Sequence, residues 1–128
     1  MRIDTVFIGI GLIVLFCGMA FGAWMGSTED FQYADAHAHL NLLGFVVPTL
    51  YCLLHHSYPG LRRSRLAWPQ CILHFAGVLT FVPGLFLVIR TGNPTVVIIG
   101  ATIVMLATLV FGFNFFTADK SEAVQARP

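Results

Sequence analysis

The chain has 128 residues, of which 57% are hydrophobic and 10% are charged, and its formal net charge is +1. A typical soluble domain carries roughly a quarter charged residues, so this composition excludes most soluble folds and disordered proteins. The near-neutral charge provides no field to attract a nucleic acid. The three cysteines lack the spacing of a secreted disulfide framework, and the bis-cysteine motif with a following histidine that attaches c-type haem is absent.

Four long intervals without Asp, Glu, Lys or Arg divide the chain. Each exceeds the about 20 residues that an α-helix needs to cross the hydrocarbon core of a bilayer. We therefore predict an all-α integral membrane four-helix bundle that forms one domain over residues 1–118, with a short tail at 119–128. Pro48 and Pro83 are expected to kink two of the helices. The helices are predicted at about 4–26, 35–56, 67–90 and 94–117.

The first predicted helix carries a stripe of small residues. Gly18, Gly22 and Gly26 have the small-xxx-small spacing that lets another helix approach closely. The stripe does not say whether that helix belongs to this chain or to another copy. A cleaved signal peptide is the alternative for this segment, but its apolar run exceeds the about 7 to 15 residues of a signal core. Trp24 and Met25 also fit a cleavage site poorly.

Basic residues predict the orientation, because Lys and Arg concentrate on the cytoplasmic side of membrane proteins. All basic residues except Arg90 fall on one side of the predicted helices, and both termini are therefore predicted to be cytoplasmic, in a bacterial-type inner (plasma) membrane. The opposite side carries the acidic connection at 27–35. The basic residues of the cytoplasmic side are Arg2, Arg62, Arg63, Arg65, Lys120 and Arg127.

Two histidines lie at the outer start of the second helix. At about 100° per residue, the imidazoles of His37 and His39 point roughly 200° apart, so they address two different neighbours. A polar side chain within the hydrocarbon is costly, and it usually faces the bundle interior, a cavity or a cofactor. Asn41, Gly44 and Pro48 share the face of His37, where small residues leave room for something flat and wide. Close helix packing is the alternative.

A second group of metal-ligating residues is predicted nearer the cytoplasmic side. Two helices each carry a Cys-x-x-His motif, which places both side chains on one helix face, so that the two motifs could form a tetrahedral zinc site. Alternatively, the cysteines act as small apolar residues and the deeper histidine hydrogen-bonds inside the bundle. That histidine lies roughly 18 Å deeper than His39 and cannot share an iron with it. The motifs are Cys52-x-x-His55 and Cys71-x-x-His74.

The run Ala-His-Ala-His-Leu-Asn-Leu-Leu-Gly-Phe at 36–45 resembles the histidine-x-histidine segment of the catalytic subunit of haem-copper oxidases. It is most similar to the nitric oxide reductase branch. In that family the first histidine binds the high-spin haem and the second the low-spin haem, on opposite sides of one helix near the outer side. Arg90 stands where the family has arginines that bind haem propionates. The resemblance covers 36–45 closely and the four-helix plan loosely.

The family's subunit has pseudo-threefold symmetry, and this chain resembles one of its four-helix thirds. Three copies of the chain could rebuild the ring, and closed symmetry would make their interfaces equivalent. The resemblance then implies a homotrimer with a six-coordinate haem b at each interface. The ligands of its iron would be His39 of one copy and His37 of the next, and Arg90 would pair with a propionate. Copper is not expected, because the His55-His56 pair lies on another helix than the family's copper pair.

Electron transfer is the activity that these expectations favour, because two strong axial ligands leave no open iron position for a substrate. Whether the chain is an enzyme stays open. One alternative is a weak axial bond and an iron that binds nitric oxide or oxygen, as in a small reductase or gas sensor. Another is a metal-binding scaffold or assembly protein without haem. The expected partners are further copies, the lipid bilayer and an unidentified redox partner, and no nucleic acid is expected.

Overall fold

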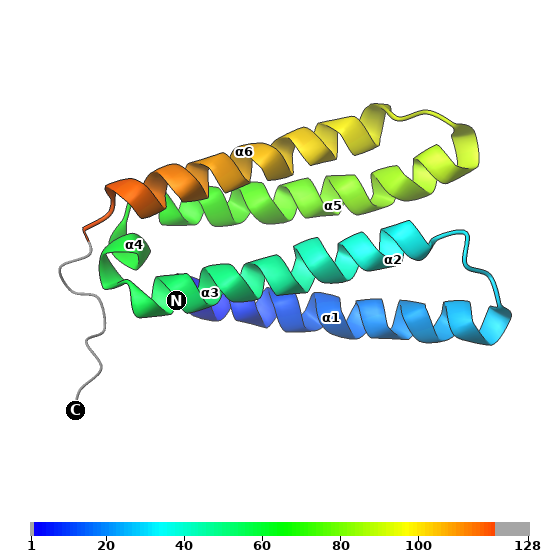
Figure 1. The fold of residues 1–128 in the computed structure, drawn as a ribbon, viewed down its shortest axis with the longest axis horizontal. Helices are drawn as coiled ribbons and strands as arrows, with labels where there is room; N and C mark the ends of the chain where they lie inside the picture. Colours follow the sequence, from blue (N-terminus) through cyan, green and yellow to red (C-terminus); the bar gives the residue numbers. More distant parts are fainter. Residues whose placement is uncertain (1, 120–128) are drawn as a thin grey trace.

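The computed structural model describes residues 2–119, and long helices run side by side in an elongated bundle (Figure 1). Four helical stretches are long and apolar enough to cross a membrane, at 3–28, 34–57, 67–91 and 95–117. The prediction of an all-α chain with four such helices is therefore confirmed over the described residues. Lys120 and Arg127 lie outside them. In chain order the helices are α1 (Ile3–Thr28), α2 (Ala34–Asn41), η1 (Leu42–Val46), α3 (Val47–Ser57), α4 (Pro59–Arg63), α5 (Ala67–Thr91) and α6 (Thr95–Thr117).

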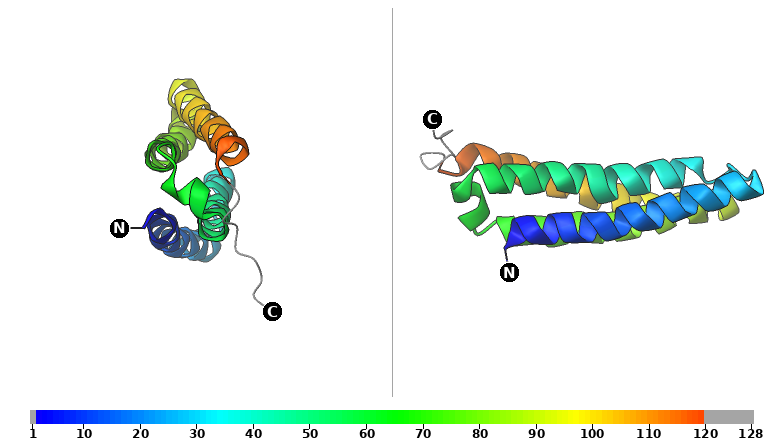
Figure 2. Two further views of the ribbon diagram at one scale, coloured as in Figure 1. Left: turned by 90° about the vertical axis from the view of Figure 1, so that its left-hand side faces the viewer. Right: turned by 90° about the horizontal axis from the view of Figure 1, so that it is seen from below.

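The bundle consists of two antiparallel pairs, α1 with α2–α3 and α5 with α6 (Figure 2). Helices α5 and α6 approach backbone to backbone. A Cβ added at Gly77 would lie 2.9 Å from the backbone nitrogen of Val104, and one at Gly84 would lie 2.6 Å from that of Val97. Glycine therefore fixes the distance between these helices. Helix α1 begins and α6 ends at the same end of the bundle (Figure 1).

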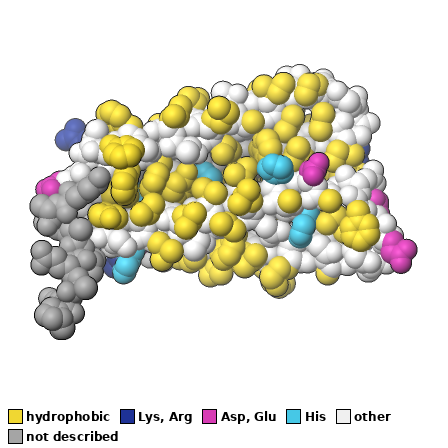
Figure 3. Space-filling model, in the orientation of Figure 1, with side chains coloured by type: hydrophobic (Ala, Val, Ile, Leu, Met, Phe, Trp, Pro, Cys, Tyr) yellow, Lys and Arg dark blue, Asp and Glu magenta, His cyan; other side chains and the backbone are white. Residues whose placement is uncertain are grey.

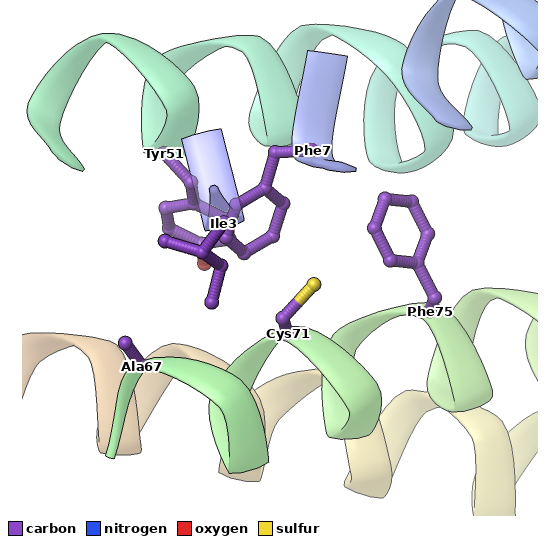
Figure 4. Packing of buried hydrophobic residues seen from close by; sticks show 6 residues of the cluster. All are labelled: Ile3, Phe7, Tyr51, Ala67, Cys71 and Phe75. Atoms are coloured by element: carbon purple, nitrogen blue, oxygen red, sulfur yellow. The ribbon is translucent and has the colours of Figure 1, made fainter. Parts of the chain in front are cut away.

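A cluster of buried apolar side chains joins the two pairs near the end where α1 begins (Figure 4). The ring of Phe7 on α1 packs against Tyr51 on α3 and Phe75 on α5, with centroid distances of 5.5 and 5.8 Å. Apolar side chains also cover much of the outer surface (Figure 3), and Leu79 and Phe116 are 74% and 80% exposed. Helices that are apolar on all sides are typical of membrane spans, and the chain has the features of a multi-pass membrane protein.

The second crossing contains a π-helical turn, η1, directly before Pro48. The backbone N–H of Val47 donates to Leu42, five residues earlier, instead of to Leu43. In this wider register the carbonyl of Leu43 would need the N–H of Pro48, which proline lacks. The Nε2–H of His74 on α5 donates to that carbonyl instead, at 2.8 Å. The predicted effect of Pro48 therefore takes the form of a widened turn, whereas α5 continues as an α-helix through Pro83.

Candidate functional site

His37 and His39 lie in α2, three and five residues after its first residue, Ala34. A rise of about 1.5 Å per residue places them roughly 5 to 8 Å from the start of this crossing. Both side chains are partly exposed, and histidine side chains reach the molecular surface in Figure 3. Side chains of this chain therefore do not seal off the region around either ring.

The imidazole of His37 packs against α1. Its Cε1 would lie 2.8 Å from a Cβ added at Gly22, and the amide of Asn41, one turn further along, fills the space in front of Gly18. Nothing lies within 4 Å of the position of a Cβ at Gly26. Two members of the glycine stripe therefore have their partner within this chain, and they make room for the polar side chains of α2.

Asn41 holds the backbone rather than the ring of His37. The Nδ2 of Asn41 donates to the carbonyl oxygen of His37 at 2.9 Å. The two ring nitrogens of His37 each lie 3.4 Å from the same Nδ2. The latter distance is beyond the usual 2.7 to 3.2 Å of an N–H donor and its acceptor. The ring of His37 has no short hydrogen bond within residues 2–119, so its nitrogens keep their capacity to bind another group.

The imidazole of His39 points to a different helix. Its ring packs against Phe81 on α5, with centroids 5.2 Å apart. Its Nδ1 lies 2.8 Å from the backbone oxygen of Asp35. A carbonyl oxygen only accepts, so Nδ1 carries a proton, and in the neutral ring Nε2 keeps its lone pair. Histidines that bind metals usually donate their other ring N–H in this way, which fixes the ring orientation and raises its basicity.

Arg90 lies at the same end of the bundle, at the end of α5. Its Nε donates to the hydroxyl of the buried Tyr33 at 3.1 Å, and the side chain is otherwise exposed. Ring contacts connect Tyr33 through Phe86 and Phe21 to His37, with centroid distances of 4.7, 5.6 and 5.9 Å. An arginine held by one nitrogen at an exposed position keeps its terminal nitrogens for an anionic group such as a propionate.

An apolar groove lies between α1, α2 and α5. Its volume of about 280 Å³ is below the roughly 300 to 1,000 Å³ of typical small-molecule sites. Neither His37 nor His39 lines it. Because neither imidazole lines it, this groove of one chain does not by itself bring a porphyrin to the two histidines. Its lining residues are Ile10, Val14, Leu40, Phe75, Val78, Leu79, Val82 and Pro83.

The four residues of the predicted zinc site do not assemble into a metal centre. Over residues 2–119, no group of three or more His, Cys, Asp or Glu side chains could hold a metal ion. His55 and His74 are fully buried, and Nε2 of His74 is occupied by the carbonyl of Leu43. Cys71 is buried in the apolar cluster, and Cys52 packs against it. This arrangement matches the alternative in which the cysteines are apolar residues and His74 hydrogen-bonds inside the bundle.

The opposite end of the bundle contains an ion cluster that sequence patterns did not predict. Asp4 is 5% exposed, and its carboxylate lies 2.6 Å from Arg2, 3.5 Å from His56 and 3.8 Å from Arg62. The hydrogen bond to Asp4 raises the pKa of the Arg2 guanidinium. The cluster connects the start of α1 to α3 and α4. The signal for it was the single carboxylate at the start of the first apolar interval.

Sequence reasoning also missed Gln70 and Asn114, which are each 1% exposed inside the bundle. The signal for them was an amide side chain within an otherwise apolar span, which is costly in a membrane and tends to face the interior. Both carry buried polar atoms that have no hydrogen-bond partner among residues 2–119.

No family model, curated protein or solved structure matches this chain. The similarity to haem-copper oxidases therefore rests on the run at 36–45, on Arg90 and on the four-helix plan.

Proposed function

We propose that this chain is a membrane protein that binds haem b between neighbouring copies in a homotrimer and transfers electrons. The observation that carries the proposal is the divergence of two partly exposed imidazoles from one helix. His37 contacts α1 and His39 contacts α5, so each ring serves a different side of α2. Two rings arranged in this way do not converge on one small ion.

The donor set fits an iron porphyrin. Hydrogen bonding to Asp35 leaves Nε2 of His39 as a lone-pair donor, and the ring of His37 has no short hydrogen bond among the described residues. Neutral imidazole is a common axial ligand of haem iron. Arg90 supplies a charge-assisted donor for a propionate at the same end of the bundle, and the adjoining apolar surface suits a porphyrin face.

The surface around the histidines favours a haem that is shared between two copies of the chain. The apolar groove of one chain is lined by neither histidine. The crossing that carries the histidines also leaves apolar side chains outward, spaced three or four residues apart as on one helix face, and these give a neighbouring copy a contact surface. They are Leu42, Val46, Leu50 and Leu53, which are 43% to 55% exposed.

Bound haem supplies reversible one-electron chemistry at its iron. The residues of this chain would set the conditions for that chemistry. The imidazoles of His37 and His39 would occupy both axial positions, and Arg90 would neutralise a propionate. Axial ligands, burial and nearby charge tune the reduction potential of a haem. Glu29 and Asp35 are exposed at this end and suit contact with a basic redox partner.

Absorption spectroscopy of the purified, dithionite-reduced protein tests the proposal. We expect the sharp bands of low-spin, six-coordinate haem and no change when carbon monoxide or nitric oxide is added. A spectrum that shifts on gas addition would contradict electron transfer through two strong axial ligands and favour a gas-binding protein. A colourless protein, after haem has been supplied during expression, would contradict haem binding altogether.

A further inference from the structure

Four polar side chains are buried in the half of the bundle that contains Asp4. His55 and His74 are 0% exposed, and Gln70 and Asn114 are 1% exposed. Many of their polar atoms have no hydrogen-bond partner among the described residues. These are Nδ1 and Nε2 of His55, Nε2 and Oε1 of Gln70, Nδ1 of His74 and Nδ2 of Asn114.

The two histidines of this set pack against one pair of aromatic rings. Tyr51 on α3 and Phe111 on α6 have ring centroids 4.3 Å apart. The ring of His55 lies 5.9 Å from that of Phe111, and the ring of His74 lies 5.3 Å from that of Tyr51. Three of the four crossings therefore meet at this point.

The pairing of α5 with α6 brings the two amides to within about one turn of each other along the bundle. Gly77 faces Val104 and Gly84 faces Val97 across this antiparallel pair. Continuing the register along both helices places Gln70 level with Phe111. From this level, Asn114 lies about one turn nearer the Asp4 end on the same face of α6, and His74 lies about one turn deeper in the bundle on α5.

The π-helical turn fixes the chemistry of His74. Its Nε2 donates to the otherwise unpaired carbonyl of Leu43, so in the neutral ring Nδ1 is an acceptor. The buried, unpartnered set thus combines acceptors and donors, and it contains no carboxylate. A neutral molecule that both donates and accepts suits this set better than a metal cation or an anion.

Burial without partners is costly, and the cost is greatest inside a membrane. An unpartnered polar group in hydrocarbon is strongly disfavoured, and buried water usually satisfies such groups with about three hydrogen bonds per molecule. The six open polar atoms of these four side chains exceed that number.

We propose that His55, Gln70, His74 and Asn114 form an internal water-binding site between α3, α5 and α6. The site lies near the Asp4 end of the bundle. His55 lies two residues before the last residue of α3, and Gln70 lies three residues after the first residue of α5. His74 is the deepest member, about 10 Å from the start of α5. The inference does not depend on haem binding.

Nuclear magnetic resonance of the full chain in phosphatidylcholine and phosphatidylglycerol vesicles tests this site. With ¹⁵N in the Gln and Asn side chains, we expect magnetisation transfer from water to the amide protons of Gln70 and Asn114. We also expect these protons to exchange in D₂O before the backbone amides of α5 around Gly77. The exposed Gln32 serves as the positive control. Absence of water transfer, with exchange as slow as that of the backbone, would overturn the proposal.

A substitution gives a second test, because it changes the unfolding midpoint in opposite directions in a site that holds water (wet) and in one that does not (dry). In a wet site, Gln70→Leu removes partners of the bound water, so it lowers the unfolding midpoint and weakens the water signal at Asn114. In a dry site, the same change removes an unsatisfied amide and raises the midpoint. Thr102→Val, on the exposed face of α6, is the matched control. If Gln70→Leu does not fold, the measurement on the native chain still decides.

Discussion

The two pairs of histidines differ in what surrounds them. His37 and His39 are partly exposed, and at least one ring nitrogen of each is free of a short hydrogen bond among the described residues. His55 and His74 are fully buried among aromatic rings of three helices. The first pair is accessible to a group from outside the chain, whereas the second pair can interact only with the chain itself and with small molecules inside it.

Neighbouring helices create this difference. Opposite His37, α1 provides Gly22, which leaves room for the ring and makes no polar contact with it. Opposite His74, the π turn provides the free carbonyl of Leu43, which accepts a hydrogen bond from Nε2. The same side chain is thus available for a ligand in one half and used for structure in the other.

Replacement of either exposed histidine should abolish haem binding. We expect His37→Ala and His39→Ala each to lose the low-spin absorption bands completely, because six-coordinate iron needs both imidazoles. The measurement is haem per mole of folded protein, with helix content checked by circular dichroism. His56→Ala is the control, since His56 lies at the Asp4 end. Retention of the bands in both test variants would contradict the ligand assignment.

The glycine beside His37 should affect the site without contributing a ligand. In Gly22→Ala, the new Cβ would lie 2.8 Å from Cε1 of His37 and displace the ring. We expect haem affinity to fall by about 1 to 3 kcal/mol, roughly fivefold to 150-fold, as measured by haem titration. Gly26→Ala has open space around its Cβ and should leave affinity unchanged. Equal affinities in the two variants would show that the position of the His37 ring is unimportant.

A buried histidine should affect stability instead of haem content. His74→Phe keeps a ring but leaves the carbonyl of Leu43 without its donor. We expect the free energy of unfolding to fall by about 1 to 2 kcal/mol, with the haem content of the folded protein unchanged. Thermal unfolding in detergent measures the first quantity and absorbance the second. If His74→Phe lost its haem but kept the native stability, His74 would belong to the haem site, which would contradict our assignment.

The smallest effect is expected from the exposed arginine. Arg90→Gln removes the charge at the His37 end, and we expect haem affinity to decrease by about 0.2 to 1 kcal/mol, as for an exposed ion pair. The decrease should become smaller in high salt, because salt screens exposed charges. Arg65→Gln, an exposed position in the connection before α5, is the control. An identical, salt-independent change in both variants would argue against a specific propionate contact.

Helix positions were predictable because the apolar intervals are bounded by charges. Each predicted helix begins and ends within two residues of its observed position, since a charged side chain is costly inside a span. The divergence of His37 and His39 also followed from helical pitch alone. The neighbours that the two rings face did not follow, because pitch says nothing about which helices lie beside α2.

Features that depend on two helices were the ones that sequence reasoning missed. Pro48 predicted a disturbance in its helix, but the widened turn and its hydrogen bond to His74 involve both the register of η1 and the position of α5. The motif containing Cys71 predicted shared metal ligands from spacing along single helices. Spacing does not show that Gln70 and Asn114 accompany the buried histidines, because their proximity arises from the pairing of α5 with α6.

The central claim is that one haem takes its two axial ligands from different copies, and mixing two inactive variants tests it most directly. Chains with His37→Ala and chains with His39→Ala are purified as folded, colourless proteins, combined in equal amounts, and allowed to exchange subunits. In a ring of equivalent interfaces, about a quarter of the interfaces then pair an intact His39 with an intact His37. We predict that low-spin haem returns at about that fraction of the native level. A mixture that exchanges subunits and stays colourless would contradict the claim.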